Sequence, residues 1–231
     1  MPLKKFLKAN TQYSKKYIRK LIEGGLVLVD NCIITDGDFT INEFSTIACE
    51  DKVLQQKTPY YIMLNKPTGV VSATSDDQHK TVIDCINETY RDQLHIAGRL
   101  DLNTSGLLIL TNDGKWSRNL TQPKNHIGKI YEVQTQQKVT QAYVDYFAKG
   151  MFFDYEQVHI QPAQLILIDD YCSTLTIYEG RYHQVKRMFA RFDNKVVKLH
   201  RTSMGNIKLD NDLKIGEYRT LTRQEIDSVE R

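Results

Sequence analysis

The chain lacks the features that mark several large classes of protein. Its four cysteines, Cys32, Cys49, Cys85 and Cys172, form neither a CxxC pair nor a disulfide framework, so we expect free thiols in a reducing cytoplasm. The histidines show no HExxH spacing, which argues against a zinc site. Neither a GxGxxG fingerprint nor a P-loop is present, and a nucleotide-cofactor fold is therefore not expected.

Long apolar runs are also missing. No window approaches the ~20 apolar residues of a transmembrane helix, and residues 1–20 are too basic for a signal peptide. We therefore expect a cytoplasmic protein without membrane contact. Low-complexity segments and internal repeats are absent too, while a hydrophobic content of 41% suffices for a packed core. A length of 231 residues allows one large domain or two smaller ones.

Charge is present in small excess but is unevenly distributed. The net charge is +3, yet residues 1–22 hold seven basic residues and no acidic one, and residues 181–201 hold seven more against Asp193 alone. Two such clusters indicate two contacts with a polyanion; the alternative is two solvated faces. The basic residues are Lys4, Lys5, Lys8, Lys15, Lys16, Arg19 and Lys20 in the first cluster, and Arg181, Lys186, Arg187, Arg191, Lys195, Lys198 and Arg201 in the second.

The first sixty residues have the pattern of a small module. Apolar residues at helical spacing predict a helix near residues 3–7, and Ser14 can cap a second helix that runs to residue 23. Strands at 26–29 and 32–34 flank a two-residue turn, and a weaker strand lies near 45–49. The second helix begins with two lysines, which its dipole disfavours by ~0.3–1 kcal/mol. An anionic partner would offset that cost.

A polar stretch at residues 50–59, ending in Pro59, is the predicted linker between domains 1–58 and 59–231. The second domain has the mixed pattern of an α+β fold. Its predicted strands are residues 60–64, 95–97, 106–110, 129–134, 163–168, 173–178 and 196–199. Its predicted helices are residues 82–89, 115–120, 141–148, 182–192 and 223–230.

The segment 98–113, GRLDLNTSGLLILTND, places an aspartate just before an apolar strand bounded by turn residues. Asp101 is therefore expected in a loop beside a rigid sheet, where catalytic side chains tend to lie. Taken alone, an aspartate in a turn more often bonds to nearby backbone N–H groups.

The segment 180–192, GRYHQVKRMFARF, predicts a helix with two different faces. Its apolar stripe, at i, i+3, i+4 and i+7, is Val185, Met188, Phe189 and Phe192, which is typical of core packing. The opposite face carries His183, Lys186, Arg187 and Arg191. Such a helix can present rigid cations to a cleft; the alternative is an ordinary solvated face.

Together these segments resemble, over nearly the whole chain, the RsuA-type family of ribosomal small-subunit pseudouridine synthases. The matching motifs are LNKP at 64–67, GRLD at 98–101, Lys129 with Tyr131, EGRYHQVKRMF at 179–189, LHR at 199–201 and GEYR at 216–219. The resemblance implies an S4-like αα-β RNA-binding module at 1–58. It further implies a pseudouridine synthase domain at 59–231, with a central mixed, largely antiparallel sheet flanked by helices. Tyrosine and histidine before Gln184 favour 16S over 23S rRNA as the substrate.

The resemblance also implies a reaction and its residues. One uridine of RNA becomes pseudouridine without a cofactor or metal. Asp101 is the expected nucleophile, which either attacks C1′ or removes the C2′ proton, and Lys186 pairs with it. Tyr131 stacks on the target base. The remaining expected contacts are Arg99, Leu199 and Lys129 for substrate, and Lys5, Lys15, Lys16, Arg19, Arg181 and Arg187 for RNA.

The expected partner is 16S rRNA in a partly assembled small-subunit particle, bound by a monomer. Two alternatives stay open: a synthase acting on 23S rRNA, and a catalytically silent RNA-binding assembly factor. A glycoside hydrolase is disfavoured because the nearest second acid, Asp113, lies beyond a strand of about four residues. That strand spans roughly 13 Å, more than the ~5–9.5 Å that hydrolysis requires.

Overall fold

The computed structural model describes residues 1–154 and 156–229. The chain divides into two compact units, Met1–Pro59 and Tyr60–Arg231, each of which is described by itself. The predicted boundary lies one residue earlier. Glu230, the last residue of the predicted helix 223–230, lies outside the described residues. Over the described ranges, no helix is both long and apolar enough to cross a membrane.

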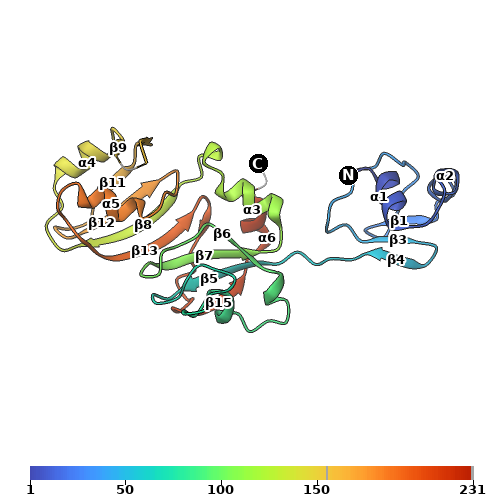
Figure 1. Cartoon of the computed structure of the whole chain (residues 1–231), viewed down its shortest axis with the longest axis horizontal. Helices are drawn as coiled ribbons and strands as arrows, with labels where there is room; N and C mark the ends of the chain where they lie inside the picture. The colour runs from blue at the N-terminus through green and yellow to red at the C-terminus, as the bar shows by residue number, and fades with distance from the viewer. Residues whose placement is uncertain (155, 230–231) are drawn as a thin grey trace. The chain divides into compact units, whose positions relative to one another are not determined.

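The first unit packs two helices on a small antiparallel sheet (Figure 1). The helices are α1 (Leu3–Asn10) and α2 (Lys15–Glu23), and the strands are β1 (Val27–Val29), β2 (Cys32–Ile33), β3 (Ile47–Cys49) and β4 (Lys52–Gln55), in the order β2-β1-β3-β4. Ser14 caps α2 as expected, because its hydroxyl accepts a hydrogen bond from the Tyr17 N–H at 3.2 Å. Asp30 and Asn31 form the tight β1–β2 turn with positive φ angles of 51° and 65°.

The predicted linker at 50–59 is partly wrong. Residues Lys52–Gln55 form β4, which pairs with β3 at the edge of the first unit's sheet. The stretch resembles a linker in sequence because Lys52 and Val53 are exposed on that edge. Polar composition therefore indicates an exposed edge strand here as well as a connection.

The second unit contains a large sheet with helices on both faces. Its strands are β5 (Tyr61–Lys66), β6 (His95–Ala97), β7 (Ser105–Thr111), β8 (Lys129–Thr135), β9 (Met151–Phe153), β10 (Val158–Ile160), β11 (Gln164–Leu167), β12 (Cys172–Ile177), β13 (Val196–Met204), β14 (Ile207–Lys208) and β15 (Tyr218–Thr220). Its helices are α3 (Gly114–Thr121), α4 (Gln141–Phe147), α5 (Gln184–Ala190) and α6 (Arg223–Asp227), with 3-10 turns η1 (Ile83–Cys85), η2 (Arg91–Gln93) and η3 (Pro123–Asn125).

The large sheet is mixed and mainly antiparallel, as expected. Its strands follow the order β11-β12-β8-β13-β7-β5-β15, with β6 added to β7 and β14 added to β13, while β9 and β10 form a separate hairpin. The pairing of β13 with β7 is parallel, whereas the other pairings are antiparallel. β13 thus joins a half built from residues 61–111 and β15 to a half built from residues 129–177.

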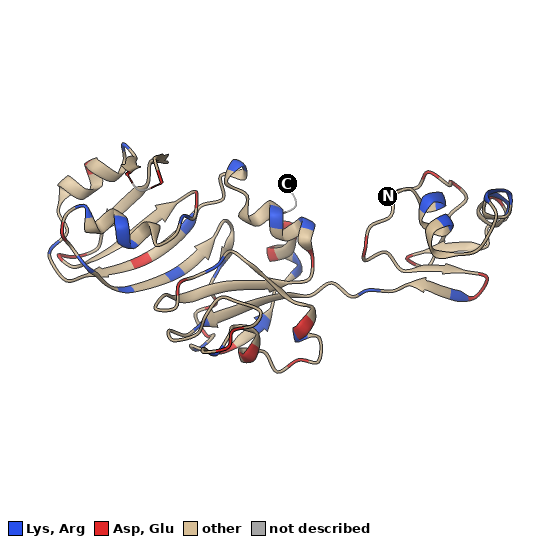
Figure 2. Ribbon diagram, in the orientation of Figure 1, with Lys and Arg blue, Asp and Glu red and all other residues tan. Residues whose placement is uncertain are grey.

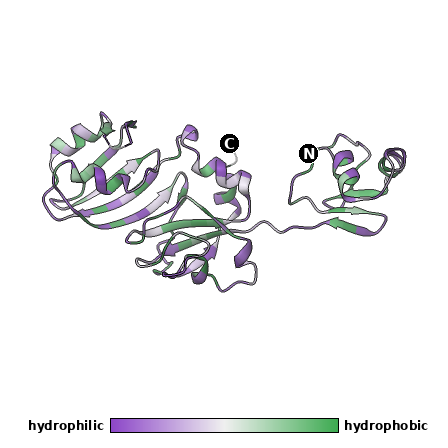
Figure 3. Cartoon of the chain, viewed as in Figure 1, coloured by the Kyte–Doolittle hydropathy of each residue, from purple (hydrophilic) through white to green (hydrophobic). Residues whose placement is uncertain are grey.

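Strand β7 is buried along its whole length because both of its faces are covered. Leu108 and Leu110 point into the larger core, to which α4 and α5 contribute, while Leu107 and Ile109 point into a second core under α3 and α6. In Figure 3 the hydrophobic colour follows the central strands accordingly. A continuous apolar run is the expected pattern for a strand buried on both faces.

The predicted helix at 82–89 is wrong. The structure has only the 3-10 turn η1 there, because Asp84 accepts hydrogen bonds from the N–H and the hydroxyl of Thr81. The apolar residues Val82, Ile83 and Ile86 are buried in the larger core, which satisfies their hydrophobicity without a regular helix.

Candidate active site

Asp101 lies in the loop between β6 and β7. Gly98 begins this loop with a φ of +87°, a conformation that favours glycine. The Leu100 N–H donates to the Ser72 hydroxyl at 3.1 Å, and that hydroxyl donates to the Leu100 carbonyl at 2.7 Å. The Thr104 N–H closes the turn on the Asp101 carbonyl at 3.0 Å. Backbone hydrogen bonds on both sides therefore fix the aspartate.

Two buried cations hold the same loop from beneath. The Lys66 ammonium, 0% exposed, lies within 3.4 Å of the carbonyl oxygens of Pro67, Asp101, Leu102 and Thr104. The Arg201 guanidinium, 1% exposed, donates to the carbonyls of Gly98 and Leu107 at 2.7 and 2.8 Å. Burial lowers the pKa of Lys66 to about 8. Carbonyl dipoles take the place of counter-ions around both groups.

The loop also depends on a close backbone approach between β7 and β13. Gly106 has a φ of +102°, and a Cβ atom there would lie 2.3 Å from the Arg201 carbonyl oxygen. Only glycine allows β13 to run this close to β7. This contact brings the Arg201 side chain beneath the Asp101 loop.

Helix α5 brings basic groups to the aspartate, as the sequence predicts. Val185, Met188 and Phe189 are buried on its core face. The Lys186 ammonium lies 3.4 Å from an Asp101 carboxylate oxygen, and the His183 Nε2 atom lies 3.7 Å from the same oxygen. The Asp101 and Lys186 side chains are 27% and 30% exposed, so the pair lies at a half-buried site that solvent and substrate can reach.

Asp101 and Lys186 open into a cavity of about 500 Å³, which also contains Tyr131, Leu199 and Arg99. Tyr131 on β8 is 6% exposed, and Leu199 on the neighbouring β13 is 5% exposed. The cavity is within the usual size range of a small-ligand site, roughly 300–1,000 Å³. The residues expected to act on the uridine therefore meet, with the exception of Lys129.

Three basic residues of the sequence prediction have other surroundings. Lys129 does not line the cavity: it is buried, its ammonium donates to the Ile127 carbonyl at 3.0 Å, and burial lowers its pKa to about 8. Arg201 belongs to the core beneath the loop and not to a surface cluster. Arg187 is engaged by the carboxylate of Glu156 and stacks over the Phe153 ring at 3.8 Å. Geometry does not favour Arg187 as an RNA contact.

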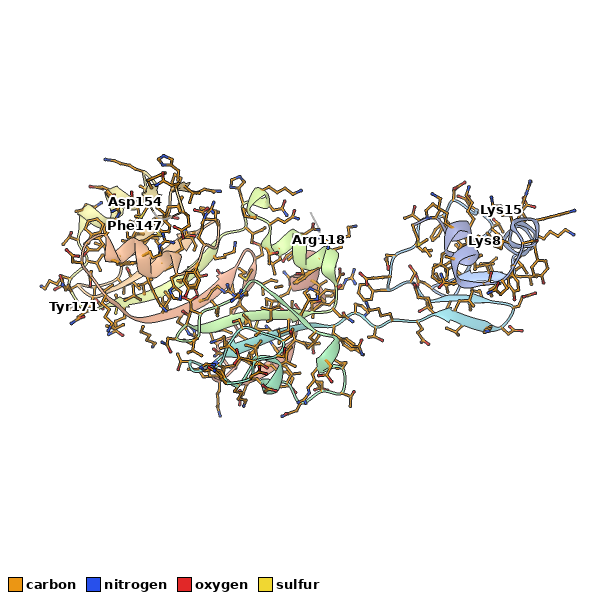
Figure 4. The ribbon with its side chains drawn as sticks, viewed as in Figure 1. Lys8, Lys15, Arg118, Phe147, Asp154 and Tyr171 are labelled. Carbon is orange, nitrogen blue, oxygen red and sulfur yellow. The ribbon has the colours of Figure 1, made fainter. Side chains whose placement is uncertain are left out.

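In the first unit the predicted RNA-binding residues gather on the two helices (Figure 2). Lys5, Lys15 and Arg19 line one hollow together with Lys4 and Lys8, which belong to the same predicted basic cluster. Figure 4 shows Lys8 on α1 and Lys15 at the start of α2. Lys16 is exposed outside this lining. In the second unit, Arg181 is exposed and lines the Asp101 cavity.

The sequence pattern indicated no role for Lys66 or Thr104, and it placed Arg201 in the second basic cluster. Thr104 is 1% exposed and lines the cavity, and its hydroxyl has no hydrogen-bond partner among the described residues. Arg201, within the motif LHR, shares its strand with Lys198, whereas Lys66, within the motif LNKP, is a single cation in an otherwise uncharged strand. That isolation was the available signal, because a lone cation in a buried strand must find local acceptors.

The described residues support neither the carboxylate pair of a glycoside hydrolase nor a metal site. Asp113, the second acid of the hydrolase alternative, caps α3 and accepts a hydrogen bond from the Tyr61 hydroxyl at 2.8 Å. Throughout residues 1–154 and 156–229, no cluster of His, Cys, Asp or Glu could hold a metal ion.

Comparison with known proteins identifies the family. The profile described as RNA pseudouridylate synthase matches residues 60–191. The chain belongs to this family. The ribosomal small subunit pseudouridine synthase A of Pseudomonas aeruginosa is 49% identical over 230 residues, covering 99% of this chain and 100% of that protein. The protein of the same name from Escherichia coli strain K12 is 43% identical over 230 residues, with coverage of 99% and 100%.

A solved structure agrees with this relationship. A chain described as "Crystal structure of pseudouridylate synthase" is 40% identical, and the match covers 99% of both chains with a TM-score of 0.72. The α+β fold with its mixed sheet is thereby confirmed. Since the full-length relatives bear the name small subunit pseudouridine synthase A, the predicted RsuA-type resemblance is confirmed as well.

Proposed function

We propose that this protein converts one uridine of 16S rRNA to pseudouridine, with Asp101 as its nucleophile. The observation that carries the assignment is the ion pair of Asp101 and Lys186, held at 3.4 Å in a cavity shared with Tyr131 and Leu199. A carboxylate fixed by its backbone, with a cation beside it, is suited to react at a ribose carbon. The names of the full-length relatives support the small subunit as the substrate's origin.

In this proposal the N1–C1′ bond of the uridine breaks, the uracil turns, and a C5–C1′ bond forms. Asp101 either attacks C1′ or removes the C2′ proton, and Lys186 holds the carboxylate in its orientation. Tyr131 stacks on the uracil and Leu199 forms the apolar floor. The uridine must leave the base stack before Asp101 can reach its C1′ atom, and this extrusion costs a few kcal/mol. Arg99, which is exposed at the cavity, fills the space left in the RNA.

We further propose that residues 1–58 are an S4-like RNA-binding module. Two helices on a small sheet, with cations of both helices lining one hollow, support this assignment. Lys5, Lys15, Lys16 and Arg19 contact phosphates in this proposal, and Arg181 does so at the cavity. We place the protein in the cytoplasm as a monomer whose partner is 16S rRNA in a partly assembled small-subunit particle.

The test is Asp101→Asn, introduced into a strain that lacks the native protein. We expect pseudouridine to disappear from its position in 16S rRNA, as mapped by carbodiimide labelling and primer extension. The thermal midpoint should stay within about 2 °C, because the Asp101 carbonyl, not its carboxylate, anchors the loop. A modified base that persists with Asp101→Asn would refute the nucleophile assignment.

The same strain separates the alternatives. If a pseudouridine is lost from 23S rRNA instead, the substrate is the RNA of the large subunit. For the silent assembly factor, the purified protein is incubated with small-subunit particles that contain C5-tritiated uridine. Release of tritium supports the isomerase, because C5 must lose its proton. Binding without release would favour the assembly factor.

A further inference from the structure

Tyr182 is an exposed aromatic ring at the rim of the Asp101 cavity. Its side chain is 73% exposed, the highest value for a large apolar side chain in the described part of the chain, and it lines the cavity. Aromatic rings normally bury most of their large surface. A ring left in solvent beside a ligand cavity therefore indicates a contact surface for the ligand.

The ring is held in a defined orientation. It stacks on the imidazole of His183 with the centroids 3.8 Å apart and the planes 19° from parallel. His183 has a positive φ of 50°, and its Nε2 atom lies 3.7 Å from the Asp101 carboxylate. The His183 imidazole thus links the Tyr182 ring to the nucleophile.

The turn that carries the stack is itself fixed. The Gln184 side chain, 3% exposed, accepts a hydrogen bond from the Arg181 N–H at 2.9 Å, while the Gln184 N–H donates to the Arg181 carbonyl at 3.1 Å. The Gln184 amide also donates to Glu179 at 3.3 Å. A ring on a preformed turn loses little conformational freedom when it binds a planar partner.

The charges around the ring suit a nucleic acid. Arg99 and Arg181 line the same cavity, and both are exposed. Cations beside an open aromatic face are the combination that binds single-stranded RNA, in which phosphates contact arginine and bases stack on rings. Tyr131, only 6% exposed, lies inside the cavity where the proposed function has it stack on the entering uracil, so the exposed Tyr182 ring is the one open to a second base.

We propose that Tyr182, backed by His183, is a stacking platform for the base next to the uridine that enters the cavity. Extrusion of the uridine removes a stacking partner from the bases on both of its sides; Arg99 enters the space between them, and the Tyr182 ring offers one of these bases a stacking surface. The identity of the entering uridine rests on the proposed function. The platform makes an unpaired neighbouring base a requirement of the substrate.

The test compares Tyr182→Ala with Tyr182→Phe, which keeps the ring, and with Tyr171→Ala. Tyr171 is 43% exposed and lies outside the cavity lining, so it is a matched surface control. The full-length proteins are titrated with the 16S RNA fragment that the wild type binds most tightly. Abasic sites are placed at one position after another along this fragment. Binding is followed by fluorescence anisotropy and modification by pseudouridine mapping.

We expect Tyr182→Ala to weaken binding by about 5- to 150-fold, the range typical of removing one base–aromatic stack. Tyr182→Phe and Tyr171→Ala should stay within about twofold of the wild type. One abasic position should weaken RNA binding by the wild type to the same extent and should leave RNA binding by Tyr182→Ala unchanged. That position should adjoin the modified uridine.

Equal reductions in affinity for Tyr182→Ala and Tyr182→Phe would overturn the platform. It would also be overturned if each abasic position lowered the RNA affinity of the wild type and of Tyr182→Ala by the same factor. If the wild type forms pseudouridine and Tyr182→Ala binds normally, the platform fails and the proposed function stands. If binding shows the stack but no pseudouridine forms, the proposed function fails and the platform stands.

Discussion

Among single residues, Lys186 places its ammonium group 3.4 Å from the Asp101 carboxylate. We expect Lys186→Met to lower kcat by about 10- to 100-fold, because the carboxylate loses its partner and its orientation. Lys186→Arg should recover part of the activity. Single-turnover rates on 16S RNA measure the effect, with the exposed Lys149→Met as the control. A normal rate for Lys186→Met would show that the 3.4 Å pair is not needed for chemistry.

Lys129 gives a prediction about pH. Burial lowers its pKa from 10.5 to about 8 in the folded chain. The unfolded chain therefore binds more protons between pH 8 and 10.5, and the contribution of Lys129 to the free energy of unfolding rises with pH across that window. We expect Lys129→Met to be more stable than the wild type at about pH 7 and to lose this advantage by about pH 10.

Urea denaturation at the two pH values measures the difference between the variant and the wild type. A change in unfolding free energy that is equal at both values would contradict the lowered pKa of Lys129.

The site residues were predictable to different degrees. Asp101 and Lys186 could be paired because their motifs carry them, and the apolar stripe of α5 fixes which face of the helix is basic. Lys129 was expected at the substrate because it shares the motif and strand face of Tyr131, but its ammonium donates to the Ile127 carbonyl and the residue does not line the cavity. The function of Lys66 depends on carbonyls 35 to 38 residues away, and strand periodicity alone does not reveal such a partner.

At the level of elements, β7 and β13 approach each other closely at Gly106. We expect Gly106→Ala to lower the free energy of unfolding by at least about 2 kcal/mol, because a Cβ atom would meet the Arg201 carbonyl at 2.3 Å in a glycine conformation. Gly180→Ala is the control, since nothing lies within 4 Å of a Cβ atom there. Equal denaturation midpoints for both variants would contradict the close approach.

Elements with a strong local pattern were predicted well. Strands β6 and β7 follow their apolar runs, and α2 begins after its Ser14 cap. The failures have physical causes. The apolar residues of the segment 82–89, Val82, Ile83 and Ile86, are explained by packing in the core, although the segment forms only one 3-10 turn. Strand β4 is polar because it lies on a sheet edge, so its hydrogen bonds to β3 are set by tertiary pairing and not by periodicity.

For the whole molecule, we expect a division in which the first unit contributes to RNA binding but not to the chemical step. We expect the double variant Lys15→Glu with Lys16→Glu to raise KM without changing kcat, because both lysines are exposed in the first unit. The salt dependence of RNA affinity should weaken by a slope of about 0.7–0.9 for each phosphate that the protein no longer neutralises. Binding titrations over a range of salt concentrations check this, with the exposed Lys52→Glu as the control. A fall in kcat at unchanged KM would contradict the division.

The central position of β13 has a consequence for biosynthesis. This strand lies between β8 and β7, and it carries both Leu199 of the cavity and Arg201 beneath the Asp101 loop. A ribosome that has translated Asp101, Tyr131 and Lys186 has therefore not yet made a site. The two halves of the sheet can close only once residues 196–204 have left the exit tunnel. Synthesis of the protein and the chemistry at Asp101 are in this way kept apart in time.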